Sequence, residues 1–223
     1  MLNGDEDSLN QVNQLLINNG NGTFTVETLP GGDSQTSSIA TADVNNDGDI
    51  DIIVGNFFQA NQVLINNGNG TFTASNLQGG TLDTRSITTA DVDDDGDIDI
   101  IVGNSGQANQ LLINDGNGTF TVEILPGGTL PTLSIATANV DDDEDVDIIV
   151  GNSGRQANQL LINDGTGTFT VSNLPGVFFT FSIVAADVNN DGFEDIIVGN
   201  DGQVNQLLIN NGDGTFTASD PPG

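Results

Sequence analysis

Four short stretches of this sequence carry oxygen-bearing side chains at alternate positions, a spacing that suits a hard metal ion. The pattern is Asp-x-Asp/Asn-x-Asp-Gly-x-x-Asp, and three of the stretches follow it in full. Alternate side chains of a tight loop converge on one point, and the glycine permits the sharp turn. The residue after the glycine can add its backbone carbonyl, and the last Asp can close the shell. The predicted ligands are Asp43, Asn45, Asp47, Asp49 and Asp51; Asp91, Asp93, Asp95, Asp97 and Asp99; Asn139, Asp141, Asp143, Asp145 and Asp147; and Asp187, Asn189, Asp191, Phe193 and Asp195.

Calcium is the ion that this donor set favours, because Ca²⁺ takes about six to eight oxygen ligands. Several carboxylates crowded together repel one another unless a cation neutralises them. The third loop departs from the pattern, with Asn139 at its first position and Glu144 in place of the glycine. A residue other than glycine is strained at positive φ, so this site is expected to be weaker. We expect three or four calcium ions per chain; solvated acidic turns without a metal are the alternative.

Composition restricts the remaining chemistry. The chain has 32 acidic residues against two basic ones, a formal net charge of −30, and no His, Cys, Trp or Tyr. His, Cys, Lys and Tyr are therefore missing for acid–base or nucleophilic chemistry, and only carboxylates and hydroxyls remain. Because the repeated loops account for most of the carboxylates, we predict no catalytic residues and no enzymatic activity. The charge opposes contact with nucleic acid and with anionic membrane surfaces. No apolar stretch approaches the ~20 residues of a membrane span, and no signal segment is visible at the N-terminus.

An internal repeat of about 48 residues organises the chain. The motif Asn-Gln-Leu-Leu-Ile-Asn or a close variant begins at Asn13, Asn61, Asn109, Asn158 and Asn205. One repeat is predicted to form four short strands, and the Asn/Gly-rich segment before the last of them is typical of a tight hairpin. A continuous apolar run in the second strand indicates burial on both faces. The predicted strands of the first complete repeat are Ile39–Val44, Asp49–Val54, Gln62–Asn66 and Thr71–Ser75.

Repeated four-stranded units predict an all-β fold, a β-propeller of four-stranded antiparallel blades with four complete blades and an N-terminal half blade. A β-solenoid is the main competitor, although its repeats are usually shorter. We expect one domain over residues 1–223, with the half blade at about 11–30 and blades at about 37–80, 85–128, 133–176 and 181–221. The blade count leaves three possibilities open: a piece of a longer array, a small ring with a defective blade, or a ring completed by several chains.

The repeat resembles a known family. Asp-Val-Asn-Asn-Asp-Gly-Asp-Ile-Asp-Ile-Ile-Val-Gly-Asn, followed by Asn-Gln-Val-Leu-Ile-Asn-Asn-Gly-Asn-Gly-Thr-Phe-Thr, is similar to the FG-GAP/VCBS-type repeats of integrin α-subunit propellers and of many bacterial secreted proteins. The resemblance covers nearly the whole chain. It implies that the acidic loop joins the first two strands of a blade and binds calcium. It also implies an extracellular or cell-surface location and a role in binding partners.

Aromatic departures from the repeat indicate a possible contact surface. Phe57 and Phe58 replace Ser-Gly or Asp-Gly, and Phe178 and Phe179 stand in a segment that is elsewhere rich in glycine. Both segments are predicted at the end of the blades opposite the acidic loops. They could bind a protein or glycan partner or another subunit, or they could fold back onto their own chain. The functions left open are a calcium-binding adhesion or interaction module, a carbohydrate-binding propeller lectin, and a structural repeat of a surface assembly.

Overall fold

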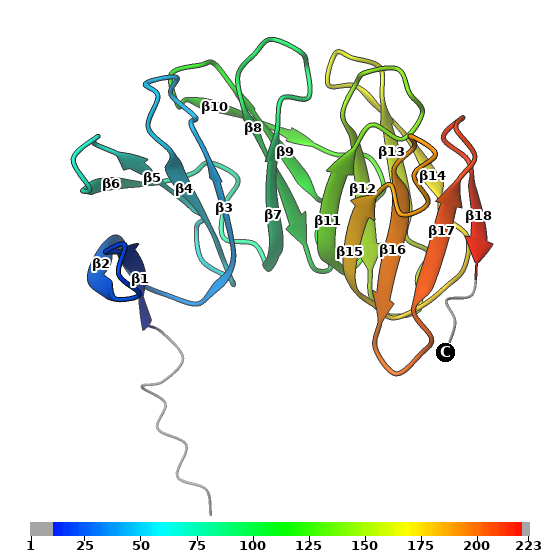
Figure 1. Ribbon diagram of the computed structural model, residues 1–223, viewed down its shortest axis with the longest axis horizontal. Coiled ribbons are helices and arrows are strands. Elements are labelled where there is room, and N and C mark those ends of the chain that lie inside the picture. Colours follow the sequence, from blue (N-terminus) through cyan, green and yellow to red (C-terminus); the bar gives the residue numbers. More distant parts are fainter. Residues whose placement is uncertain (1–10, 220–223) are drawn as a thin grey trace, which may run out of the picture.

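The computed structural model describes residues 11–219, which form eighteen β-strands in five antiparallel sheets and contain no helix. Each complete blade is a four-stranded sheet whose strands pair in chain order (Figure 1). The half blade is β1 (Gln11–Asn18) with β2 (Phe24–Ser34). Blade one is β3 (Thr36–Ala42), β4 (Asp51–Asn56), β5 (Gln62–Asn66) and β6 (Phe72–Asn76). Blade two is β7 (Thr84–Ala90), β8 (Asp99–Asn104), β9 (Gln110–Asn114) and β10 (Phe120–Ile124). Blade three is β11 (Thr132–Ala138), β12 (Asp147–Asn152), β13 (Gln159–Asn163) and β14 (Phe169–Asn173). Blade four is β15 (Thr180–Ala186), β16 (Asp195–Asn200), β17 (Gln206–Asn210) and β18 (Phe216–Ser219).

The predicted fold class is confirmed, and the third strand of blade one has the predicted bounds. The first two strands of that blade are displaced from their predicted positions. Strand β3 begins and ends earlier than expected because its ladder with β4 runs from Thr36 opposite Asn56 to Ala42 opposite Asp51. Strand β4 begins at Asp51, so Asp49 belongs to the acidic loop. The loop therefore contains all the predicted ligands except its last, which is the first residue of the following strand.

The core lies between successive blades. Every residue of the second strand is buried in blades one to three, as its apolar run predicted. Ile53 of blade one, for example, shares a buried cluster with Ile87 and Ile100 of blade two. A phenylalanine recurs near the start of the fourth strand of each repeat. Phe120 belongs to the buried core between blades, whereas Phe24 of the half blade is 54% exposed.

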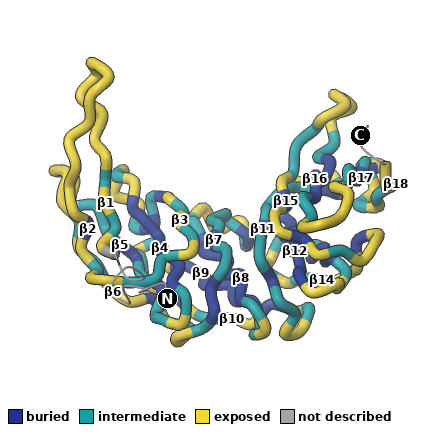
Figure 2. Tube along the Cα trace, turned by 90° about the horizontal axis from the view of Figure 1, so that it is seen from below, coloured by how far each residue is buried: buried dark blue, intermediate teal, exposed yellow. Residues whose placement is uncertain are grey.

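The described blades form an open crescent, with the half blade at one tip and blade four at the other (Figure 2). The first strands of successive blades contact one another along the inner side of this crescent. Within residues 11–219 the chain therefore does not close into a small ring, which was one of the three possibilities left open by the sequence. The loops after the first and third strands lie at one end of each blade, and those after the second strand lie at the other, because neighbouring strands are antiparallel. None of the described residues belongs to a helix long and apolar enough to cross a membrane.

Candidate metal centre

The last Asp of each acidic stretch is hydrogen-bonded both to the segment that follows the first strand and to the end of the third strand. Asp51 is fully buried, and its two carboxylate oxygens accept the backbone N–H groups of Val44 and Asn66 at 3.0 and 2.7 Å. The same pair of bonds occurs in the other three blades. Each carboxylate oxygen has a second lone pair, so these bonds do not prevent it from binding a metal.

The second loop has the geometry of a metal site. Asp91, Asp93 and Asp99 each place a carboxylate oxygen within 4.8 Å of the others. Oδ1 of Asp91 and Oδ1 of Asp93 are buried and have no hydrogen-bond partner. A buried polar atom without a partner is costly, and a charged one more so, unless an ion or water satisfies it. All these donors are hard oxygens, so the residues fit a calcium ion.

The pKa values of two carboxyl groups in this loop are raised. Burial raises the pKa of Asp99 to about 6, although the hydrogen bonds from Asn114 and Val92 oppose the change. Burial also raises the pKa of Asp93, and the nearby charges of Asp95 and Asp91 add to the effect. Without a cation, the folded loop therefore disfavours the ionised carboxylates that a cation would bind.

The first and fourth loops have more hydrogen bonds between their own side chains than the second loop. Asn45 donates its amide to Asp47 at 2.8 Å, and Asn189 donates to Asp191 at 2.7 Å. The first Asp of each loop accepts the N–H of the glycine, at 2.8 Å for Gly48. With an Asn in place of the second carboxylate, these loops carry less internal repulsion than the loop of blade two.

The third loop differs, as its sequence predicted. Glu144 has φ of +78°, close to the +89° of Gly48 at the equivalent place, so the turn is made at the cost of backbone strain. Asn139 accepts the N–H of Asp142 at 2.9 Å, which draws its side-chain oxygen into the turn. Oδ1 of Asp141 is nevertheless buried without a partner. The oxygen donors are present, but the loop is strained.

The residue after each glycine, or after Glu144 in loop three, was predicted to offer only its backbone carbonyl. Its side chain lies against the loop between the third and fourth strands of its own blade, as when Asp49 approaches Gly68. Gly68 has φ of +73°, a backbone conformation that suits glycine. The other three pairs are Asp97 with Gly116, Asp145 with Gly165, and Phe193 with Gly212.

The sequence reasoning missed a latch between blades. Asn114 ends β9, and its buried side-chain amide donates to the carbonyl of Val44 in the acidic loop of the preceding blade at 2.9 Å. Asn163 and Asn210 make the same bond to Val92 and Val140. The sequence shows only that an Asn ends each repeat of the motif, and it does not reveal the partner of that Asn. Each latch ties the acidic loop of one blade to the third strand of the next.

The aromatic segments lie at the opposite end of the blades, as predicted. Phe57 pairs with Asp83 in an isolated bridge, and the Arg85 guanidinium lies 4.5 Å from the centre of the Phe57 ring. Phe58 is 56% exposed and Phe179 is 37% exposed, whereas Phe57 and Phe178 are partly buried. The rings of Phe58 and Phe179 are therefore not folded back onto their own chain.

Comparison with known proteins identifies the repeat. The sequence model of the family described as FG-GAP-like repeat matches residues 2–54, 43–102, 91–150, 139–198 and 187–223. No curated protein matches this sequence.

Solved structures share the fold. An Agrocybe aegerita lectin described as recognising non-reducing terminal N-acetylglucosamine is 24% identical, with a TM-score of 0.62 over 92% of this chain and 60% of its own. BBS1N, solved in complex with ARL6DN, is 14% identical, with a TM-score of 0.57 over 82% of this chain and 55% of its own. The V. cholerae biofilm matrix protein Bap1 is 14% identical, with a TM-score of 0.55 over 95% of this chain and 39% of its own. This chain thus spans about half the length of the solved proteins it matches.

Proposed function

We propose, from the premise that this chain belongs to the FG-GAP-like repeat family, that it is a non-catalytic calcium-binding propeller module that acts outside the cell in adhesion or protein interaction. The single observation that carries the calcium assignment is the loop of blade two. There, two buried carboxylate oxygens, of Asp91 and Asp93, lack any hydrogen-bond partner and lie close to an oxygen of Asp99. A cation would relieve such a cluster while leaving the carboxylates ionised.

Calcium in these loops would be structural. The ion would neutralise the converging carboxylates and hold the corner between the first two strands of each blade. Binding stabilises a folded protein by RT ln(1 + [L]/Kd), about 1.4 kcal/mol for each site at tenfold Kd. Three or four such sites would contribute roughly 4–6 kcal/mol, comparable to the net stability of a domain.

The test is thermal unfolding of the full chain in millimolar calcium and in excess EDTA, with bound calcium counted by elemental analysis. We expect three or four ions per chain and a clear fall of the midpoint in EDTA. Asp93→Asn should weaken calcium binding in loop two without abolishing it, because it removes one negative charge and leaves the side-chain oxygen that Asn45 and Asn189 offer at the same position. The matched control is Glu123→Gln, an exposed carboxylate on β10 outside the loops. If the wild-type chain holds no calcium and its midpoint does not move, the calcium proposal is wrong.

A carbohydrate-binding role is the second candidate, supported by one specific cluster. Exposed Phe58 adjoins Phe57, with ring centres 4.4 Å apart, and Arg85 forms a 2.6 Å ion pair with Asp83 beside them. Apolar rings next to polar groups of this kind are typical of sugar sites, and the similar Agrocybe aegerita structure is a lectin. Phe58 has φ of +50°, where the other blades have glycine. Phe58→Gly should therefore fold at least as well and lose any signal on a glycan array; a signal that survives the substitution would exclude this site.

A further inference from the structure

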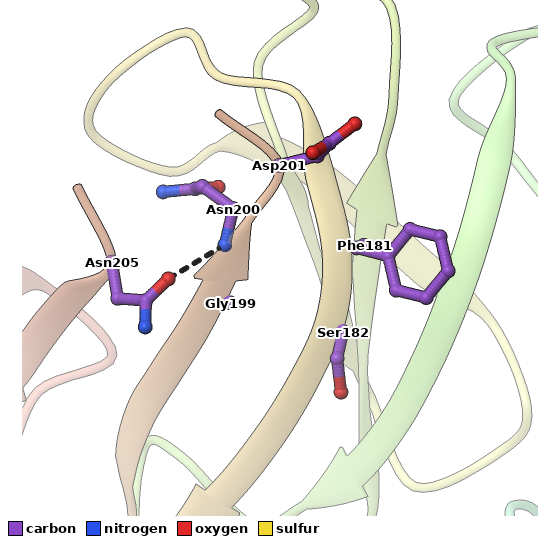
Figure 3. Close-up of a pocket in the computed structure, with 6 residues that line it drawn as sticks. All are labelled: Phe181, Ser182, Gly199, Asn200, Asp201 and Asn205. Atoms are coloured by element: carbon purple, nitrogen blue, oxygen red, sulfur yellow. Dashed lines mark hydrogen bonds between the residues drawn. The ribbon is translucent and has the colours of Figure 1, made fainter. Parts of the chain in front are cut away.

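Many asparagines of this chain hold the backbone in place. In blade four, for example, the side-chain oxygen of Asn205 accepts the backbone N–H of Asn200 at 2.9 Å, across the loop between β16 and β17 (Figure 3). A different set of asparagines lies in the loops between the third and fourth strands, where each of them precedes a glycine. The described Asn-Gly pairs of these loops begin at Asn19, Asn21, Asn67, Asn69, Asn117 and Asn211.

An asparagine followed by glycine can lose its side-chain amide without an enzyme. The backbone nitrogen of the glycine attacks the side-chain carbon Cγ, the proton of that nitrogen passes to solvent, and the amide nitrogen leaves as ammonia. The five-membered succinimide that results adds one water and opens to aspartate or isoaspartate. Glycine has no Cβ to hinder the attack. A fold favours the reaction when it leaves both nitrogens free and places hydrogen-bond donors on the oxygen where negative charge develops.

The loop of blade one provides all of these conditions at Asn69. Its Oδ1 accepts the backbone N–H of Thr71 at 3.0 Å and the Thr71 hydroxyl at 2.7 Å. Two donors on one carbonyl oxygen resemble the oxyanion holes that stabilise such charge. The turn that these bonds close also folds Cγ back toward the nitrogen of Gly70. Within the described residues neither the Asn69 amide nor the Gly70 N–H donates a hydrogen bond, and both residues are exposed.

The half blade repeats this arrangement at Asn21. Its Oδ1 accepts the N–H of Thr23 at 3.0 Å and the Thr23 hydroxyl at 2.6 Å. In both loops the threonine hydroxyl also accepts a hydrogen bond at 2.9 Å, from the amide of Asn19 or of Asn67. A hydroxyl that accepts a hydrogen bond becomes a stronger donor. Each reactive asparagine is thus activated by a threonine and, through that threonine, by a second asparagine.

The same network protects the neighbouring Asn-Gly pairs. In blade one the Gly68 N–H donates to the side-chain oxygen of Asn66 at 3.1 Å, so the nitrogen that would attack is engaged. The amide of Asn67 is held by Thr71, and its oxygen accepts the hydroxyl of Thr73 at 3.2 Å. Equivalent bonds hold the pairs that begin at Asn19 and Asn211.

Blades two and four show what the other loops do at the position of Asn69. The amide of Asn117 donates to the carbonyl of Asp115 at 3.2 Å, and Asp115 takes the N–H of Thr119, so the oxygen of Asn117 is not activated. In blade four the position is occupied by Asp213, which accepts both the N–H and the hydroxyl of Thr215. This loop therefore accommodates the aspartate that the reaction would produce.

We propose that Asn21 and Asn69 are sites of autocatalytic deamidation, at which the folded chain converts its own asparagine to aspartate or isoaspartate. Each site takes up one water and releases one ammonia, and no other reactant is needed. At Asn69 the conversion adds a negative charge at the end of the blade where the acidic loops lie. An aspartate product keeps the turn, as Asp213 does, whereas isoaspartate adds a methylene to the backbone and disrupts it. The proposal does not depend on whether the acidic loops bind calcium.

The first test follows ammonia release and peptide masses while the freshly purified full chain is kept in mildly alkaline buffer, with and without urea. Every pair has glycine in second place, so the pairs should react at similar rates in urea. In the folded chain we expect Asn69 to convert on the order of tenfold faster than Asn67, and Asn21 to exceed Asn19 similarly. Equal rates within a loop, or conversion of Asn69 in urea alone, would overturn the proposal.

The second test removes one donor from one site. Thr71→Val should slow the conversion of Asn69 several-fold, and Thr71→Ser should restore it, while Asn21 in the same molecule reacts as before. An unchanged rate at Asn69 in Thr71→Val would contradict the proposal. If that variant misfolds, which an altered rate at Asn21 would reveal, the comparison of Asn69 with Asn67 in the wild-type chain decides. Asn69→Asp is the product control: it should keep the midpoint of thermal unfolding and release one ammonia fewer per chain.

Discussion

Glu144→Gly should stabilise this protein, because Glu144 occupies a backbone conformation that suits glycine. Its φ is +78°, and the glycines at the equivalent place in the other acidic loops have φ of +89°, +90° and +96°. The Glu144 side chain is exposed, and no hydrogen bond of it is seen in the described structure. Removing it therefore relieves backbone strain without leaving a buried group unpaired.

The magnitude is the difference of two opposing effects. Holding an ordinary L-residue in the left-handed region costs about 1–2 kcal/mol. Glycine has more freedom to lose on folding, which takes back about 0.5–1 kcal/mol. Loss of one negative charge beside the carboxylates of the loop adds a small gain in the calcium-free state. A net gain of about 1 kcal/mol corresponds to a rise of about 2–4 °C in the unfolding midpoint of a chain of this size.

Urea and thermal unfolding in EDTA measure this gain without metal. The reciprocal variant Gly96→Glu installs the same strain in loop two and should cost a similar amount. Asp142→Asn is the matched control, since it removes a neighbouring exposed charge and keeps a residue that tolerates its φ of +65°. If Glu144→Gly is neutral or destabilising while Gly96→Glu is harmless, the backbone-strain argument is refuted.

Three further outcomes are expected. In EDTA the midpoint of thermal unfolding should fall as pH rises from about 4 to about 6. Burial raises the folded-state pKa of Asp99 to about 6, so the stability that comes from its protonated form is lost over that range. Calcium should make the midpoint depend less on pH. Asp93→Asn should stabilise the EDTA form and reduce the gain in midpoint from calcium, as thermal scans in both buffers would show; a variant that gains from calcium as much as the wild type contradicts this. Asn114→Ala should cost about 1–3 kcal/mol in urea unfolding, because it strands the Val44 carbonyl; Asn66→Ala, whose partly buried amide bonds only the carbonyl of Ile50 at 3.2 Å, is the milder control.

The sequence predicted the elements that depend on local spacing. The acidic loops, the hairpin glycines and the strain at Glu144 are local features, set by residues a few positions apart. The predicted bounds of the first two strands were less accurate. The strand β4 begins at Asp51 because this side chain is buried, and burial cannot be read from local spacing. Whether these loops bind calcium stays a prediction.

Contacts between repeats could not be predicted in the same way. Asn114 reaches Val44 across 70 positions of the chain, and nothing local distinguishes it from an asparagine that merely ends a strand. Burial of the repeated isoleucine depends on its neighbour in space: Ile87 is 6% exposed, and Ile39 at the equivalent position is 54% exposed. The local sequences around these two residues are similar, with Thr-x-Ser-Ile in both, and give no sign of that difference.

The latch connects the predicted calcium loops to the packing between blades. The N–H of Val44 donates to Asp51, a predicted calcium ligand, while the carbonyl of Val44 accepts from Asn114 of the following blade. One residue therefore joins the metal loop to the junction between blades.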